Sequence, residues 1–282
     1  MKKVLLTGAT GFIGNYVVAE LLKAGHKVIV VSRSMEKARS CKWFTQVQFI
    51  QYDLNQTSEN FFRLFQQPDQ LIHLAWEGLP NYNELFHLER NLPCSYSFIK
   101  NMVQNGLRNL VVIGTCLEYG LQEGALYESM ETKPVTCYGL AKDTLRKFIE
   151  QLQKKFDFEF KWIRLFYLYG EGQSENSILE QLKSAIAKGE TVFPMSGGEQ
   201  QRDYLHVEKA AEYIVKISTQ TKQQGIFNCC SGNPISIRSF VEEYLRKTGQ
   251  SIKLDLGRYP YPDYEPMVFW GDNKKMGKAL KY

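Results

Sequence analysis

The chain has 282 residues, 44% of them hydrophobic and 23% charged, with a formal net charge of +5. This is the composition of an ordinary soluble globular protein, and because no basic cluster is interleaved with aromatic residues, it disfavours nucleic-acid binding. The six cysteines show neither C-x-x-C spacing nor histidine partners at metal-ligand spacing. No apolar stretch reaches the roughly 18 residues of a membrane-spanning helix. We therefore expect a cytoplasmic protein with reduced thiols, no bound metal and no membrane contact.

Strands and helices alternate through the first 165 residues. Apolar and β-branched runs predict the strands, and apolar residues recurring every three to four positions predict the helices. Such alternation predicts an α/β fold with a doubly wound parallel sheet of the Rossmann type. The strands are expected at 4–6, 28–31, 47–52, 70–75, 110–113 and 160–166, and the helices at about 13–22, 85–104 and 138–156.

The first predicted strand runs directly into a glycine-rich turn and then into a helix. Residues 3–14 read K-V-L-L-T-G-A-T-G-F-I-G. Gly8 permits a sharp turn, Gly11 permits the backbone to approach a pyrophosphate, and Gly14 permits close crossing of helix and strand. Because the helix N-terminus also presents N–H groups to an anion, this segment predicts a dinucleotide site.

The alternation stops after residue 170, where loops rich in Gly, Ser and Glu appear and one further helix is expected at 207–217. Pro and Tyr crowd the stretch 259–266. We expect two domains on this basis. They are a dinucleotide-binding domain, residues 1–165 with about 203–230, and a smaller mixed substrate-binding domain, residues 166–202 with 231–282.

Two Tyr-x-x-x-Lys pairs occur, Tyr96/Lys100 and Tyr138/Lys142. Tyr96 falls on the apolar stripe of the helix before the fifth strand, which predicts a packed aromatic. Tyr138 opens the helix after that strand, at the sheet edge where ligands bind in open α/β folds. The four-residue spacing places Tyr138 and Lys142 on one helical face, where an ammonium can stabilise a phenolate. With Thr115 at the end of the fifth strand, the pair predicts a proton-transfer site beside a hydride carrier.

The chain resembles, over nearly its whole length, the extended short-chain dehydrogenases/reductases that act on nucleotide-linked sugars. The segments that carry the resemblance are T-G-A-T-G-F-I-G (7–14), Asp53-Leu54, H-L-A (73–75), Asn91, G-T-C-L-E-Y-G (114–120), Y-G-L-A-K (138–142), R-L-F-Y-L-Y-G (164–170) and R-D-Y-L-H-V (202–207). The resemblance implies that Thr115, Tyr138 and Lys142 are the catalytic trio. It implies cofactor contacts from Gly8, Thr10, Gly11, Phe12, Ile13, Gly14, Asp53, Leu54, Leu74, Ala75, Asn91, Tyr138 and Lys142, with Asp53 on the adenine.

A nucleotide-diphosphate sugar is the substrate that the resemblance implies. Arg202 and Arg258 are expected to hold its diphosphate, since a guanidinium fork suits phosphate oxygens. Trp76 would shape the sugar pocket, although it would equally fit a packed core. Phe193 would stack on the nucleobase, although an apolar residue before Pro194 more often belongs to the core. Tyr167 replaces the family's usual Asn, and Glu171 a common proline, which leaves the sugar's pose open. The expected substrate contacts are Trp76, Thr115, Tyr167, Phe193, Arg202 and Arg258.

The end of the second strand bears on the choice of cofactor. NAD is usually selected there by an acidic residue on the ribose 2′-hydroxyl, and NADP by a cation on the 2′-phosphate. Residues 30–34 read V-V-S-R-S, with no acid and with Arg33 in place. We therefore expect NADP(H), with NAD(H) as the alternative.

A soluble NADPH turned over in each cycle fits the net reduction of a keto sugar. We expect reduction of the C4 keto group of a nucleotide-linked 4-keto-6-deoxyhexose, as in dTDP- or CDP-6-deoxy sugars made for surface polysaccharide. A 4,6-dehydratase is disfavoured because Cys116 and Leu117 stand where those enzymes carry an Asp-Glu pair; the next residue, Glu118, is expected to be structural or a neighbour of the site mouth. Two alternatives stay open, an NAD-dependent 4-epimerase and a non-catalytic NADP-binding module. A homodimer is expected through helices 85–104 and 138–156.

Overall fold

The computed structural model describes residues 1–281. Its main sheet contains β1 (Lys3–Thr7), β2 (Lys27–Ser32), β3 (Gln48–Gln51), β4 (Gln70–His73), β5 (Asn109–Thr115), β7 (Glu159–Leu165) and β11 (Gly225–Cys229). These seven strands are all parallel and lie in the order β11-β7-β5-β4-β1-β2-β3. The order reverses beside β1, which creates the crevice where ligands bind in doubly wound folds. The predicted Rossmann-type α/β fold is confirmed.

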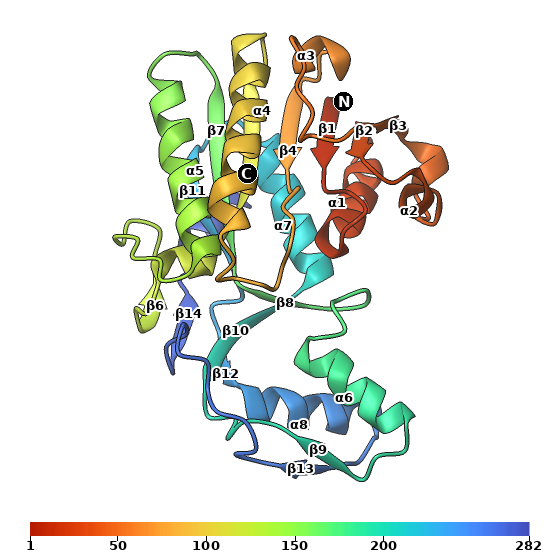
Figure 1. Cartoon of the computed structure of the whole chain (residues 1–282), viewed down its shortest axis with the longest axis vertical. Helices are drawn as coiled ribbons and strands as arrows, with labels where there is room; N and C mark the ends of the chain where they lie inside the picture. Colours follow the sequence, from red (N-terminus) through yellow and green to blue (C-terminus); the bar gives the residue numbers. More distant parts are fainter. Residues whose placement is uncertain (282) are drawn as a thin grey trace.

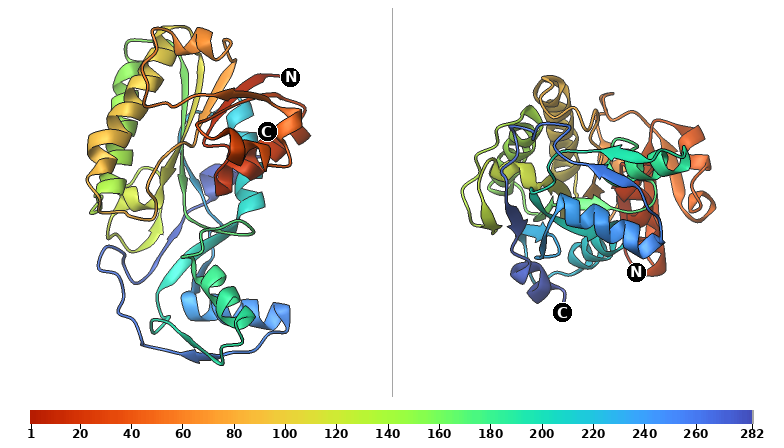
Figure 2. Two further views of the ribbon diagram at one scale, coloured as in Figure 1. Left: turned by 45° about the vertical axis from the view of Figure 1, so that its right-hand side comes forward. Right: turned by 90° about the horizontal axis from the view of Figure 1, so that it is seen from below.

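Helices cover both faces of this sheet (Figures 1 and 2). Side chains alternate between the faces along each strand, so Val4 and Leu6 enter one core and Leu5 the other, and all three are buried. No helix within residues 1–281 is both long and apolar enough to cross a membrane. One face carries α1 (Phe12–Lys23), α2 (Met35–Arg39), α7 (Val207–Thr219) and α9 (Lys274–Ala279), and the other carries α3 (Phe61–Leu64), α4 (Leu92–Gln104) and α5 (Cys137–Gln153).

The predicted helix over residues 85–104 is two elements, the π-helical turn η2 (His87–Asn91) followed by α4. Pro93 lies at the start of α4. It has no N–H to donate to the carbonyl of Glu89, so an unbroken α-helix cannot run through both segments. His87 and Asn91 of η2 are both buried.

A smaller part of the fold lies beyond the carboxyl edge of the main sheet (Figure 1). It has its own apolar core, built around Leu182, Phe193 and Val241. The division into two domains with the bounds given above stays a prediction. Its elements are β8 (Tyr167–Tyr169), β10 (Gln201–His206) and β12 (Pro234–Ser236) in one sheet, β9 (Val192–Pro194) paired with β13 (Lys253–Asp255), and the helices α6 (Ile178–Ala187) and α8 (Ile237–Thr248).

Short elements connect the two parts. β14 (Phe269–Gly271) pairs with β6 (Gly124–Leu126), which follows β5 and the 3-10 turn η3 (Cys116–Tyr119). A second 3-10 turn, η1 (Phe44–Gln46), precedes β3. The chain thus crosses between the parts several times, and β11 returns to complete the main sheet after β8 to β10 have been built.

Candidate active site

A cavity of about 1020 Å³ follows the carboxyl edge of the main sheet. It is lined by the segments that leave β1, β2, β4 and β5, and by the smaller part through Leu168, Gln173 and Glu265. The structure therefore brings most of the predicted site residues to one place. Those that line the cavity are Gly8, Thr10, Gly11, Phe12, Ile13, Gly14, Arg33, Asp53, Leu54, Leu74, Ala75, Trp76, Asn91, Thr115, Tyr138, Lys142 and Tyr167.

The glycine-rich turn fits a dinucleotide pyrophosphate. Gly8 has φ +75°, and a Cβ there would lie 2.8 Å from the backbone nitrogen of Ala75. A Cβ at Gly14 would collide with the Gly8 carbonyl oxygen where α1 crosses β1. The N-cap of α1 is Gly11, which provides no side-chain hydrogen bond to the first turn. The first N–H groups of α1 are therefore available to an anion in the cavity.

Thr115, Tyr138 and Lys142 all line the cavity. Thr115 ends β5, and Tyr138 and Lys142 lie one turn apart in α5. The helix begins at this place because the hydroxyl of Thr136 caps it, accepting a 3.0 Å hydrogen bond from the Gly139 nitrogen. The Lys142 ammonium donates a 2.8 Å hydrogen bond to the Ile113 carbonyl oxygen. Strand, cap and helix thus place the three side chains as a unit.

Burial sets the protonation of Tyr138 and Lys142. It raises the pKa of Tyr138 well above the usual value, and a hydrogen bond with Thr115 opposes this only in part. It lowers the pKa of Lys142 to about 7, against the opposing field of Glu118. We expected the Lys142 ammonium to stabilise the phenolate, but burial is the largest influence on the pKa of Tyr138 and raises it. The phenol is therefore protonated at neutral pH, which is the form of a proton donor.

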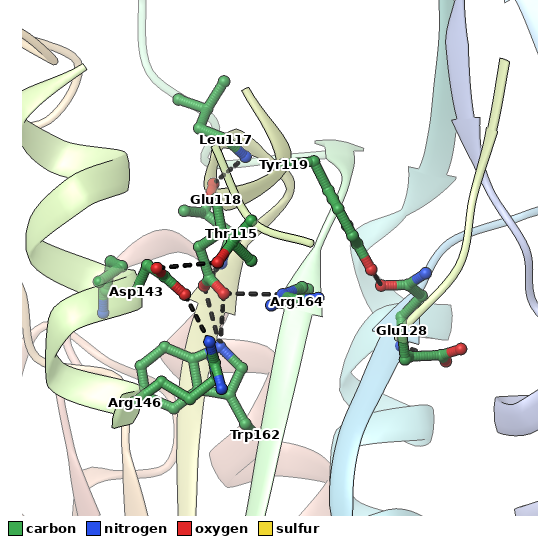
Figure 3. A network of polar contacts seen from close by, with 12 residues as sticks. Thr115, Leu117, Glu118, Tyr119, Glu128, Asp143, Arg146, Trp162 and Arg164 are labelled. Carbon is green, nitrogen blue, oxygen red and sulfur yellow. Dashed lines mark hydrogen bonds and ion pairs between the residues drawn. The ribbon is translucent and has the colours of Figure 1, made fainter. Parts of the chain in front are cut away.

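Glu118 holds the backbone of Thr115 from behind (Figure 3). Its Oε1 accepts hydrogen bonds of 2.9 Å from the Thr115 nitrogen and 2.9 Å from Trp162 Nε1. Its Oε2 accepts a 2.7 Å hydrogen bond from Arg164 Nε. Glu118 was expected to be structural or a neighbour of the site mouth, and the structure assigns it this supporting role. The signal was present in the sequence, because T-C-L-E at residues 115–118 matches a capping box.

Arg33 is already paired. Its guanidinium lies 2.6 Å from a carboxylate oxygen of Glu77, and the other oxygen of Glu77 lies 3.0 Å from Arg90. All three residues line the cavity. Because β1 lies between β2 and β4, the pair of Arg33 and Glu77 joins the segments on either side of the glycine-rich turn. Neither Glu77 nor Arg90 belongs to a pattern that the sequence alone would reveal.

Three predicted substrate residues lie away from the cavity wall. Phe193 is buried in the core of the smaller part, and Arg258 is exposed on a loop. Arg202 is 1% exposed, and its Nη2 donates a 2.9 Å hydrogen bond to Glu265. Glu265 lines the cavity and also accepts a hydrogen bond from the Tyr167 hydroxyl. It therefore stands between Arg202 and the cavity, a placement that the aperiodic stretch 259–266 did not predict.

Comparisons with known proteins identify a family and several relatives of this chain. Residues 4–230 match the family model described as the NAD dependent epimerase/dehydratase family. The chain is 33% identical to the dTDP-6-deoxy-L-talose 4-dehydrogenase (NAD(+)) of Aggregatibacter actinomycetemcomitans, over 95% of this chain and 98% of that protein. It is 26% identical to the UDP-glucose 4-epimerase of Neisseria meningitidis serogroup C, over 91% of this chain and 85% of that protein.

Solved structures agree on the fold. MoeE5 in complex with UDP-glucuronic acid and NAD superposes with a TM-score of 0.85 at 24% identity, over 99% of this chain and 93% of that one. The UDP-glucuronic acid 4-epimerase from Bacillus cereus, in complex with UDP-glucuronic acid and NAD, gives a TM-score of 0.85 at 23% identity, over 99% and 93%. At this level of identity the likeness shows the architecture alone.

Proposed function

The chain belongs to the NAD dependent epimerase/dehydratase family, and from this premise we propose that it reduces the C4 keto group of a nucleotide-linked 4-keto-6-deoxyhexose. The observation that carries the proposal is the intact trio of Thr115, Tyr138 and Lys142 on the wall of one large cavity. The most similar curated relative reported above supports the position, since its name places a dehydrogenation at C4 of a 6-deoxy sugar. Reduction is the reverse of that reaction.

The chain's own residues would perform the proton chemistry. A dinucleotide held by the glycine-rich turn and the N-terminus of α1 would supply the hydride. The Tyr138 phenol is protonated at neutral pH and would donate its proton to the sugar oxygen as negative charge develops there. Thr115, whose backbone is held by Glu118, would offer its hydroxyl to the same oxygen. The Lys142 ammonium would hold ribose hydroxyls and stabilise the phenolate that remains.

A dehydratase is again disfavoured by the site. Elimination of water needs one acid and one base next to the reacting sugar. Cys116 is buried, and burial raises the pKa of its thiol far above the usual value, so it remains neutral. Leu117 cannot exchange a proton at all. These two positions therefore offer neither group.

We propose NAD(H) as the cofactor, in place of the NADP(H) expected from the sequence. The expectation of NADP(H) rested on Arg33 as a cation for a 2′-phosphate, but its charge is met by Glu77. A phosphate placed beside Arg33 would also approach the Glu77 carboxylate, which opposes it. The NAD(+)-dependent relative supports the same choice. NADP(H) is the alternative that a direct comparison of the two cofactors would decide.

The test is an oxidation assay with purified protein. NADH and NADPH would each be offered with dTDP-, CDP-, UDP- and GDP-linked 4-keto-6-deoxyhexoses, and the C4 configuration of the product would be read by NMR. We expect stoichiometric oxidation of NADH with one of these sugars. Interconversion of 4-hydroxy sugars without added cofactor would instead identify an epimerase. Cofactor binding without any turnover would identify a binding module.

We also propose a homodimer through α4 and α5, which lie side by side on the outer face (Figure 1). Phe148 of α5 is 44% exposed and packs edge-on against Tyr96 of α4, with 5.2 Å between ring centroids. Leu140 on α5 is exposed as well. Light scattering after size exclusion should give twice the 32.6 kDa chain mass, and Phe148→Glu with Leu140→Glu should give a monomer. A monomeric parent protein would refute the dimer.

A further inference from the structure

The side chain of Lys142 meets an aromatic ring where a buried cation ordinarily needs a carboxylate. Lys142 is 2% exposed, and its Nζ lies 4.0 Å from the ring centroid of Trp76. Glu118, the acidic group whose field acts on Lys142, is itself bonded to Arg164 and Trp162. The ammonium is therefore stabilised by its hydrogen bond to the Ile113 carbonyl oxygen and by the indole face of Trp76.

Trp76 is fixed in this position from its other edge. Its Nε1 donates a 3.0 Å hydrogen bond to Nδ1 of His87, and the opposite ring nitrogen of His87 lies 2.9 Å from the Asn81 carbonyl oxygen. The carbonyl can only accept, so the proton of His87 is on Nε2 and Nδ1 is the acceptor. The Trp76 ring also meets the edge of Tyr138, with 5.9 Å between centroids. The indole cannot turn away from Lys142 without losing these contacts.

We propose that Trp76 is a positioning residue, which keeps the Lys142 ammonium charged and aimed into the cavity. This inference rests on the proposed role of Lys142 in holding the cofactor ribose. The sequence offered two interpretations of Trp76, a packed aromatic and a wall of the sugar pocket, and neither would affect the charge of Lys142. The proposal goes beyond them because an indole face over a desolvated cation stabilises the charged form of that cation.

The charged and titratable groups around Lys142 come from four elements. Tyr138 shares α5, Glu118 and Cys116 belong to η3, His73 ends β4, and His87 belongs to η2. Burial lowers the pKa of His73 to about 3 and also lowers the pKa of His87. It raises the pKa values of Tyr138 and Cys116. Lys142 is therefore the group in this cluster that titrates closest to neutral pH, with its pKa at about 7.

The experiment measures the binding of NADH between pH 6 and pH 9, by the fluorescence of the nicotinamide and without any sugar. NADPH would be measured in parallel. Affinity should fall with rising pH as Lys142 loses its proton. Trp76→Leu should move the midpoint down by about one pH unit and weaken binding about tenfold at pH 8. Trp76→Phe retains a weaker aromatic face and should move the midpoint less.

Two control variants test whether the titration comes from Lys142 and whether its shift is specific to Trp76. Lys142→Met should abolish the titration, which identifies Lys142 as its source. Trp270→Leu, a tryptophan on β14 that does not line the cavity, should leave the midpoint unchanged. The proposal is overturned if folded Trp76→Leu titrates like the parent protein, or if Lys142→Met retains the same titration. Because no sugar is present, failure of the proposed 4-ketoreductase activity would not affect this outcome.

Discussion

Glu118 and Arg164 form a 2.7 Å ion pair between side chains that are 0% and 1% exposed, directly behind the end of β5. The same carboxylate fixes the backbone nitrogen of Thr115 and the indole of Trp162. Two charges removed from water depend on one another, because either one left alone would be buried without a counter-charge. The support of the proposed catalytic threonine is therefore also a sensitive point of the fold.

Removing Glu118 should destabilise the protein strongly. Glu118→Ala should lower the free energy of unfolding by about 3–5 kcal/mol, since it leaves the Arg164 guanidinium buried and unpaired. Urea denaturation followed by circular dichroism would measure this. The matched control is Glu242→Ala, which removes an exposed ion pair with Arg238 and should cost less than about 1 kcal/mol. Equal effects of the two substitutions would contradict the assignment.

Tyr138→Phe should lower kcat by about 10²–10⁴-fold, because it removes the proposed proton donor and little else. NADH affinity and thermal stability should stay near those of the parent protein. Tyr96→Phe is the control, since Tyr96 belongs to the other Tyr-x-x-x-Lys pair, packs against Phe148 of α5 and does not line the cavity. Substantial turnover by Tyr138→Phe in the keto-sugar assay would rule out Tyr138 as the acid.

Lys142→Met should stabilise the fold while abolishing turnover. Burial lowers the pKa of Lys142 from 10.5 to about 7, so the unfolded chain holds this proton more tightly than the folded chain does. Folding therefore carries a penalty at low pH that is relieved as pH rises from 7 to 10.5. The variant should be more stable by roughly 1–4 kcal/mol at pH 6, and the gap should narrow towards pH 10. A gap that stays constant or widens with pH would contradict this account.

Glu77→Gln should weaken the preference for NADH over NADPH. The substitution keeps the size of the side chain but removes the negative charge beside Arg33 and Arg90, so a 2′-phosphate meets two cations without an opposing anion. The ratio of kcat/KM values for the two cofactors should shift towards NADPH by about tenfold, on the order of 1.4 kcal/mol. Glu89→Gln, an exposed position in η2, should leave the ratio unchanged. An unaltered ratio in Glu77→Gln would show that Glu77 does not act on the cofactor.

The parts of the site that the sequence predicted are those built within one short segment. The glycine-rich turn joins one strand to one helix, and Tyr138 and Lys142 lie one turn apart, so local spacing is sufficient to place them. The pairing of Arg33 with Glu77 is different in kind. It depends on two loops that meet because β1 lies between β2 and β4 in the sheet. The two residues are far apart in the sequence, so no local pattern predicts their contact.

The smaller part was harder to predict for a related reason. Glu265 reaches Tyr167 and Arg202 from a loop without periodicity, and its position depends on contacts made after the whole chain has folded.

Pro93 did carry a local signal, since a proline near the start of α4 marks the end of the π-helical turn before it. The periodicity of the apolar residues alone did not reveal that break.

The return of β11 to the edge of the main sheet has a consequence for how the protein is made. Residues 225–229 pair with β7 only after the strands β8 to β10 have been synthesised. A nascent chain that has just completed β7 therefore still exposes an unpaired edge of backbone N–H and C=O groups. A fragment truncated after residue 165 would lack that edge strand and the helix α7 that packs on α1. Synthesis of the main sheet is therefore complete only after the chain has passed through β8, β9 and β10 of the smaller part.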